Sequence, residues 1–215
     1  MSVVLRRRTM VAHFSLGVLG ACASGVMAAA EAPVVLVVGD SLSAEYGIKA
    51  GSGWVALLQK RLSEQKQPHR VVNASISGDT TAGGRSRLPA ALNKHKPAIV
   101  VIELGGNDAL RGLPLTSTRE NLLEMARAAQ QAGAKVVVVG MQVPPNYGTR
   151  YASDFEGLFT DVAKQTRASL VPFLLKGVAD RKDALEWFQP DRIHPLAKAH
   201  PTMLDNVWPA LKPLL

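Results

Sequence analysis

Five short, valine-rich apolar runs recur along this 215-residue chain, at 34–38, 70–74, 98–104, 135–140 and 170–173. None of them alternates regularly between polar and apolar side chains. A strand that is apolar on both faces is buried from both sides, which is typical of a parallel sheet covered by helices. The runs therefore predict a five-stranded parallel sheet.

Helical patterns lie between these runs, with apolar side chains repeating on one face at 54–62, 122–129 and 155–163. Strands that alternate with helices pack as a sheet between two helical layers and are joined by right-handed crossovers. The sequence thus predicts an α/β fold, specifically a three-layer α/β/α sandwich.

Three short signals predict helix ends. Ser117 with Glu120, and Ser153 with Glu156, have the spacing of capping boxes and predict helix starts at these serines. Gly133 predicts the end of the helix before the fourth strand.

Composition fits one globular domain, with 47% hydrophobic and 20% charged residues. The formal net charge is +8, and it is +5 without the three arginines at 6–8. The other basic residues are scattered and do not alternate with aromatic ones, so we expect no nucleic-acid partner. Cys22 is the single cysteine, which excludes an internal disulfide and a cysteine-rich zinc site.

The first thirty residues have the order of a secretory signal peptide: three arginines, an apolar stretch, and alanines at 28–30. We expect residues 1–30 to be removed and residues 31–215 to form a single, exported domain, periplasmic or secreted, without a stable membrane span. Two alternatives stay open. Residues 9–30 are nearly long enough for a membrane anchor, and the lipobox-like segment 19–22 would make Cys22 an acylated first residue.

Polar segments follow the predicted strands, where parallel sheets gather their working residues. They read Gly-Asp-Ser-Leu-Ser at 39–43, Asn-Ala-Ser-Ile-Ser-Gly-Asp-Thr at 73–80, Gly-Gly-Asn-Asp at 105–108 and Asp-Arg-Ile-His at 191–194. Together they resemble the GDSL lipase family, also called SGNH hydrolases, over essentially all of residues 33–215. The likeness is greatest to the exported acyl-CoA thioesterase I type, also described as arylesterase or lysophospholipase.

The resemblance implies the flavodoxin-like SGNH hydrolase fold, a nucleophilic Ser41, and an oxyanion hole that includes Gly78 and Asn107. It also implies the late Asp-x-x-His element of Asp191 and His194. The subgroup usually has glycine where this chain has Arg192. If that position needs a positive φ, arginine strains the turn; if not, its cation borders the groove.

The chemistry can be followed from the residues themselves. A serine hydroxyl needs a base to take its proton and a third group to orient that base. Asp191 can reach the imidazole Nδ1–H of His194, three residues later, while Nε2 faces Ser41. We expect Ser41 to begin a helix, and we assign three oxyanion donors: the backbone N–H groups of Ser41 and Gly78 and the side-chain amide of Asn107.

Two loops, 109–115 and 143–151, contain apolar residues together with glycine and proline. This composition suits the apolar, adaptable wall of a groove for an acyl chain, and we expect both loops to line it. The resemblance implies fatty acyl esters and thioesters as substrates, among them lysophospholipids, aryl esters and acyl-CoA. Export favours lysophospholipids or other envelope esters, because acyl-CoA is cytoplasmic. The predicted substrate-binding residues are Leu110, Arg111, Gly112, Leu113, Pro145 and Tyr147.

Other functions stay open from the sequence. Relatives of the same family deacetylate carbohydrates, and a non-catalytic flavodoxin-like binding domain would share the topology. An adhesion role would leave the serine, asparagine and histidine pattern unexplained. His69, His95 and His200 show no metal-ligand spacing, so we expect surface or packing roles for them and no bound metal. We also expect no cofactor, and we expect the enzyme to be a monomer.

Overall fold

The computed structural model describes residues 1–2 and 31–215, of which Ala32–Leu215 form one compact unit. The predicted signal peptide, with Cys22, falls outside the described residues except for Met1 and Ser2. Among the residues described, no helix has the length and apolar character needed to cross a bilayer.

The unit is built on a five-stranded sheet in which every neighbouring pair is parallel, in the order β2-β1-β3-β4-β5. Each strand lies within two residues of its predicted bounds, so the prediction of five parallel strands is confirmed. The strands are β1 (Val34–Gly39), β2 (Arg70–Asn73), β3 (Ile99–Glu103), β4 (Lys135–Val139) and β5 (Ser169–Val171).

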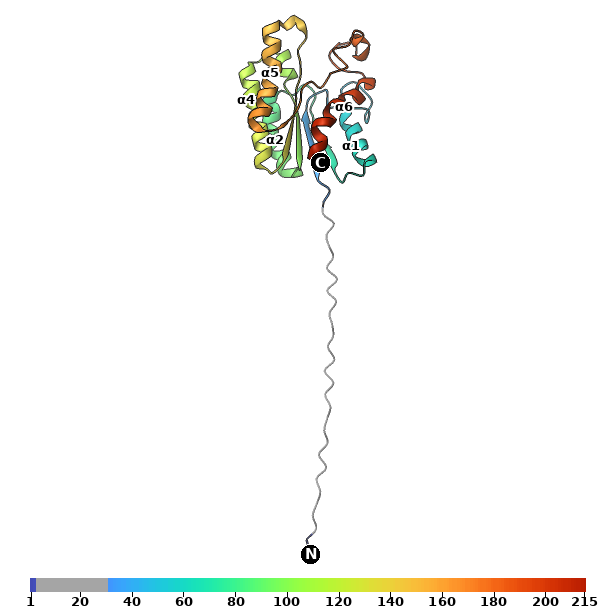
Figure 1. The fold of residues 1–215 in the computed structure, drawn as a ribbon, viewed down its shortest axis with the longest axis vertical. Coiled ribbons are helices and arrows are strands. Elements are labelled where there is room, and N and C mark those ends of the chain that lie inside the picture. Colours follow the sequence, from blue (N-terminus) through green and yellow to red (C-terminus); the bar gives the residue numbers. More distant parts are fainter. Residues whose placement is uncertain (3–30) are drawn as a thin grey trace. The chain divides into compact units, whose positions relative to one another are not determined.

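Helices cover both faces of this sheet (Figure 1). One layer holds α2 (Thr81–His95), α4 (Leu115–Gln131) and α5 (Thr149–Thr166), and the other holds α1 (Trp54–Glu64) and α6 (His200–Leu211). The predicted three-layer sandwich is therefore correct. The short elements are α3 (Gly106–Leu110) and the 3-10 turns η1 (Pro145–Tyr147), η2 (Ala184–Trp187), η3 (Ala197–Ala199) and η4 (Lys212–Leu214).

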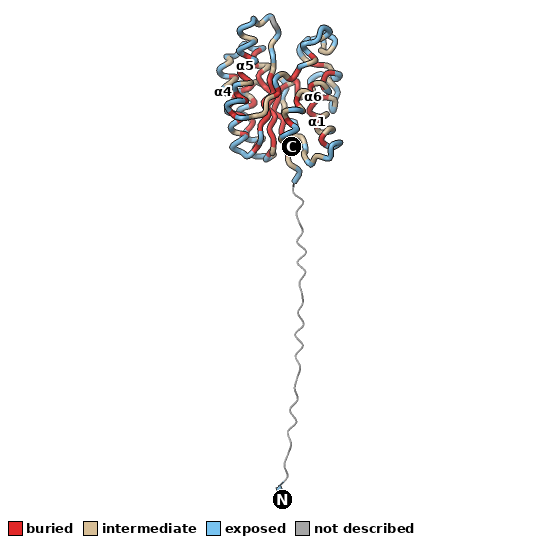
Figure 2. Tube along the Cα trace, in the orientation of Figure 1, coloured by how far each residue is buried: buried red, intermediate tan, exposed pale blue. Residues whose placement is uncertain are grey.

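The two cores explain why the strands lack polar alternation. Along β1, Val34, Leu36 and Val38 pack under α2, α4 and α5, while Val35 and Val37 pack under α1 and α6. Successive side chains of a strand point to opposite faces, and here both faces are buried, as the red strands of Figure 2 show. Because all five strands are parallel, their carboxyl ends lie at one edge of the sheet.

Two predicted helix starts are wrong. Ser117 and Ser153 lie inside their helices, because α4 begins at Leu115 after Pro114 and α5 begins at Thr149 after Gly148. Pro114 has φ −60°, which proline favours just before a helix, and Gly148 has φ 88°, a turn that glycine makes readily. The predicted stop is confirmed, since Gly133 follows the end of α4 with φ 86°.

Candidate active site

Ser41 lies in a series of turns after β1, not at the start of a helix, so that prediction is wrong. The carbonyl of Asp40 accepts the N–H groups of Ser43 and Ala44 at 3.2 and 2.9 Å, which closes a single helical turn. Glu45 and Gly47 then adopt left-handed φ values of 60° and 69°, and a helix cannot continue through them. The local geometry at Ser41 is thus set by one turn, without a helix dipole behind it.

A continuous chain of hydrogen bonds joins Ser41 to the last loop of the domain. Ser41 Oγ lies 2.9 Å from His194 Nε2, and His194 Nδ1 lies 2.7 Å from Asp191 Oδ2. Asp191 Oδ1 also accepts the backbone N–H groups of Ile193 and His194, at 2.9 and 3.0 Å. These backbone hydrogen bonds, with that of the imidazole, lower the pKa of Asp191 to about 2, so its carboxylate is charged at neutral pH. The three predicted triad residues are therefore together in space.

Tyr46 and Gln189 hold His194 in place through a ring contact and hydrogen bonds. The Tyr46 ring lies 4.3 Å from the His194 ring, centroid to centroid. Gln189 donates its backbone N–H to the His194 carbonyl at 2.7 Å and its side-chain amide to the Tyr46 carbonyl at 2.9 Å. Sequence reasoning missed both residues, because neither lies in a motif.

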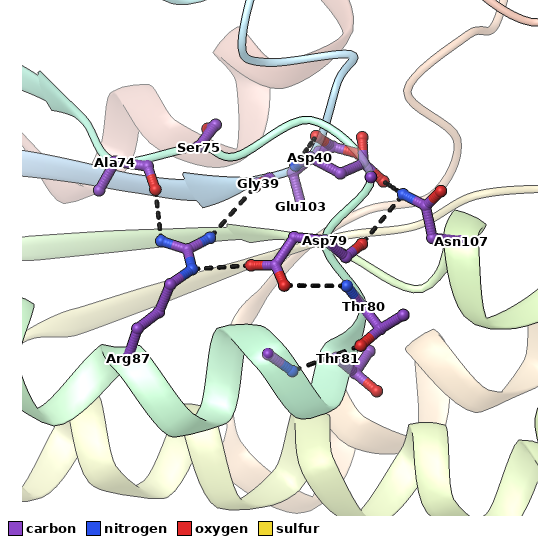
Figure 3. Close-up of polar contacts among 12 residues, drawn as sticks. Gly39, Asp40, Ala74, Ser75, Asp79, Thr80, Thr81, Arg87, Glu103 and Asn107 are labelled. Carbon is purple, nitrogen blue, oxygen red and sulfur yellow. Dashed lines mark hydrogen bonds and ion pairs between the residues drawn. The ribbon is translucent and has the colours of Figure 1, made fainter.

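Asn107 lies in α3 immediately after Gly105 and Gly106, and Gly105 makes the sharp turn with φ 124°. The Asn107 amide nitrogen donates to Asp40 Oδ2 at 3.0 Å and to the Asp79 carbonyl at 2.9 Å (Figure 3). Both of its hydrogens therefore have acceptors.

Gly78, next to Asp79, has φ 80°, a backbone conformation that glycine adopts without strain. Its carbonyl accepts the Arg111 guanidinium at 2.7 Å. Ser41 and Gly78 lie in two loops, and Asn107 of α3 is hydrogen-bonded to both loops through Asp40 and Asp79.

Behind this edge lie two buried carboxyl groups. Burial raises the pKa of Asp40 to about 6, although the Leu42 N–H and the Asn107 amide oppose the shift. Glu103, at the end of β3, is buried as well, and burial together with the nearby Asp40 raises its pKa well above the usual value. Sequence reasoning missed Glu103, although a glutamate closing a wholly apolar strand is itself a signal.

The sequence of residues 37–201 matches the GDSL-like lipase/acylhydrolase family. The chain belongs to that family. It is 54% identical to esterase TesA of Pseudomonas aeruginosa, over 86% of this chain and 91% of the relative. It is also 39% identical to thioesterase 1/protease 1/lysophospholipase L1 of Escherichia coli K12, over 87% of each. A crystal structure of TesA matches with a TM-score of 0.81 and 54% identity, covering 85% of this chain and 99% of that one. The predicted family, fold and class of activity, ester hydrolysis, are confirmed.

Beside the site of this GDSL hydrolase lies a cavity of about 470 Å³. Leu110 lines it, as predicted, with Val143 and Pro144 of the second predicted loop. Arg111, Gly112, Leu113 and Tyr147 are not among its lining residues, and nothing is described of the Pro145 side chain. Most of the wall comes from residues 173–193, of which sequence reasoning considered only Arg192; the others are Phe173, Leu175, Ala179, Asp180, Ala184, Leu185, Phe188 and Ile193.

The structure shows both the backbone conformation of Arg192 and its position relative to the cavity, which the sequence left open. Its φ is 60°, so the position does use the left-handed conformation in which glycine is unstrained. For a residue with a Cβ this conformation costs about 1–2 kcal/mol. The side chain also lines the cavity, which adds a cation to a mostly apolar wall that holds Asp180 as well.

Within the described part of the chain, no group of three His, Cys, Asp or Glu residues could hold a metal ion. His200 is buried, and its Nδ1 accepts the Trp54 N–H at 3.0 Å. Burial lowers the pKa of His200 to about 4, so it is neutral at physiological pH. Its role in this GDSL hydrolase is to join α6 to the start of α1.

Proposed function

We propose that this GDSL hydrolase cleaves fatty acyl esters and thioesters through an acyl-enzyme intermediate on Ser41. The observation that carries the proposal is the unbroken chain from Ser41 Oγ through His194 to the charged Asp191. Such a chain activates a serine hydroxyl that would otherwise be a weak nucleophile.

In the acylation step, Ser41 Oγ attacks the carbonyl carbon while His194 Nε2 accepts the hydroxyl proton. Asp191 holds Nδ1–H and stabilises the imidazolium that forms. The tetrahedral intermediate then collapses, and the imidazolium gives its proton to the departing alkoxide or thiolate. Water repeats the sequence on the acyl-enzyme, which releases the carboxylic acid and restores Ser41.

The oxyanion that forms during each attack would be held by the backbone N–H groups of Ser41 and Gly78 and by the Asn107 amide. The Asn107 hydrogens point to Asp40 Oδ2 and to the Asp79 carbonyl before substrate binds. A developing negative charge is a stronger acceptor than the neutral Asp79 carbonyl, so it would draw one of these hydrogens away.

The cavity supports an acyl substrate over an acetylated sugar. Its volume and its wall of leucine, phenylalanine and alanine suit an apolar chain, whereas an acetyl group needs only a fraction of that space. Arg192 at the wall can pair with an anionic head group, which favours lysophospholipids among the candidate esters.

For the whole chain, we propose that residues 1–30 direct export and that the domain of residues 31–215 acts outside the cytoplasm as a monomer. The order of arginines, apolar stretch and alanines supports this proposal. Acylation of Cys22 would lead to the same compartment with a lipid anchor.

A panel of aryl esters, lysophospholipids and acyl-CoAs of graded chain length tests the proposed substrate class. We expect turnover that rises with acyl length and vanishes in Ser41→Ala for every substrate. Hydrolysis of acetylated sugars alone would overturn the proposed substrate, and turnover by folded Ser41→Ala would overturn the mechanism.

A further inference from the structure

One arginine outside all the recognised motifs reaches the backbone behind the candidate oxyanion hole. Arg87, on α2, donates from Nε to Asp79 Oδ2 at 2.7 Å and from Nη2 to the Gly39 carbonyl at 3.2 Å. Its Nη1 donates to the carbonyl of Ala74. Figure 3 shows the guanidinium spread across these three acceptors.

The three acceptors belong to two segments, the end of β1 and the loop between β2 and α2, and each segment leads to a proposed oxyanion donor. Gly39 ends β1 two residues before Ser41, and Ala74 follows the end of β2 on the way to Gly78. Asp79 follows Gly78 directly, and its carbonyl accepts the Asn107 amide. A single side chain is thus bonded to the segments that lead to Ser41 and Gly78, and through Asp79 it also reaches Asn107.

The contact between Arg87 and Asp79 is largely buried and closely packed. Asp79 Oδ1 accepts the Thr80 N–H at 3.0 Å, and the side chains of Arg87 and Asp79 are only 22% and 12% exposed. A Cβ at Gly83 would lie 1.9 Å from Asp79 Oδ1, so only glycine leaves room for the carboxylate over the first turn of α2.

We propose that Arg87 is a positioning residue for the oxyanion hole, one that fixes the Ser41, Gly78 and Asn107 donors relative to one another. The inference rests on the proposed function of those three groups. Arginine suits the task because its planar guanidinium presents several N–H donors in fixed directions, whereas lysine offers one compact charge. Small errors in the placement of catalytic groups are costly, up to about 10²-fold in rate for 1 Å.

The test compares Arg87→Met with Arg85→Met, a matched control two residues away on the same helix. Arg85 pairs with Glu124 at 3.1 Å, and both side chains are about half exposed. For a soluble aryl ester, we expect Arg87→Met to lower kcat roughly 10- to 100-fold with KM within about twofold. We expect Arg85→Met to keep kcat within about twofold.

A second readout reports on the oxyanion itself. A catalytic serine adds to the carbonyl carbon of a long-chain alkyl trifluoromethyl ketone. The hemiketal that forms leaves a negative oxygen in the oxyanion hole. We expect the inhibition constant of the ketone to rise in Arg87→Met by the same factor by which kcat/KM falls. A purely structural role would weaken this inhibitor no more than it weakens the fatty acid product.

Arg87→Lys and Asp79→Asn keep the test decisive if Arg87→Met does not fold. Each should lower kcat at unchanged KM, by a smaller factor than Arg87→Met. Wild-type kcat in folded Arg87 variants, while Asn107→Ala is impaired, would overturn the inference and leave the proposed oxyanion hole standing. Wild-type kcat in both Arg87→Met and Asn107→Ala would instead show that the proposed hole is wrong.

Discussion

The Ser43 hydroxyl and the Glu103 carboxyl group join the loop of Ser41 to the end of β3. Ser43 Oγ donates to Glu103 Oε2 at 2.6 Å and accepts the indole N–H of Trp54 at 3.2 Å. A Cβ at Gly39 would lie 2.7 Å from both Glu103 Oε2 and Ser43 Oγ, so the strand must end in glycine here. The loop of Ser41, the proposed nucleophile, therefore lies directly against a buried carboxyl group.

This contact predicts a pH-dependent effect of Glu103→Gln on stability. Because the pKa of Glu103 is raised above its usual 4.5, the folded state keeps a proton that the unfolded chain releases as pH rises. The contribution of Glu103 to the stability of the wild-type protein therefore falls above pH 4.5, by up to about 1.4 kcal/mol per pH unit. Urea unfolding between pH 4.5 and 8 should show Glu103→Gln gaining stability relative to wild type as pH rises.

Glu64→Gln, on the exposed end of α1, is the matched control and should show no such trend. A constant difference between Glu103→Gln and wild type across the pH range would mean that Glu103 is not held protonated.

Ser41→Ala should abolish ester hydrolysis while leaving the fold intact, because the hydroxyl supplies the attacking oxygen and little packing. A fluorophosphonate probe should label the wild-type enzyme at residue 41, as read by mass spectrometry, and should not label the variant. Ser77→Ala, on the exposed neighbouring loop, should keep both activity and labelling. Labelling at any other serine would refute the assignment.

Asn107→Ala should lower kcat roughly 10²- to 10³-fold, or about 2.7–4 kcal/mol, with little change in KM, because the amide acts mainly in the transition state. Asn107→Asp should be at least as damaging, since it places a second negative charge beside Asp40 and the developing oxyanion. Steady-state kinetics on an ester whose chemistry limits turnover provides the measurement. If both folded variants keep more than about a third of wild-type kcat, Asn107 does not donate to the oxyanion.

Ala179→Phe should shorten the preferred acyl chain, because Ala179 lines the cavity and a phenyl ring would fill part of it. We expect kcat/KM to fall roughly 10-fold for long-chain esters and to stay within about twofold for butyrate, as steric exclusion from an apolar pocket predicts. Ala90→Phe, exposed on α2, serves as the control. Equal losses for short and long chains would place the acyl chain elsewhere.

The sheet could be predicted from sequence because local patterns determine it. The runs that form the central strands β1, β3 and β4 are buried on both faces by the flanking helices, which is what their apolar composition predicts. The helix starts at Leu115 and Thr149 were harder, because Pro114 and Gly148 override the capping-box spacing of Ser117 and Ser153. Backbone conformation just before a helix is stronger than a side-chain signal within its first turns.

The candidate triad was predictable because its motifs are short and contiguous. Arg87 and the cavity wall were not, for a different physical reason. Arg87 acts through carbonyl groups of Gly39 and Ala74, which every residue possesses and no sequence pattern marks. The wall at 173–193 is mostly turns, whose path depends on what they pack against rather than on any periodicity.

Asp191 and His194 belong to one four-residue turn, whereas Ser41 is 153 residues away from His194 in the chain. The hydrogen bonds between the proposed acid and base therefore lie within one turn, and they do not depend on the rest of the domain. Within the proposed triad, only the 2.9 Å contact to Ser41 depends on how this loop packs against the loop of Ser41. A displacement of the loop would break the hydrogen bond between His194 and Ser41 but keep the one between His194 and Asp191. The Ser41 contact could then form again without any local refolding.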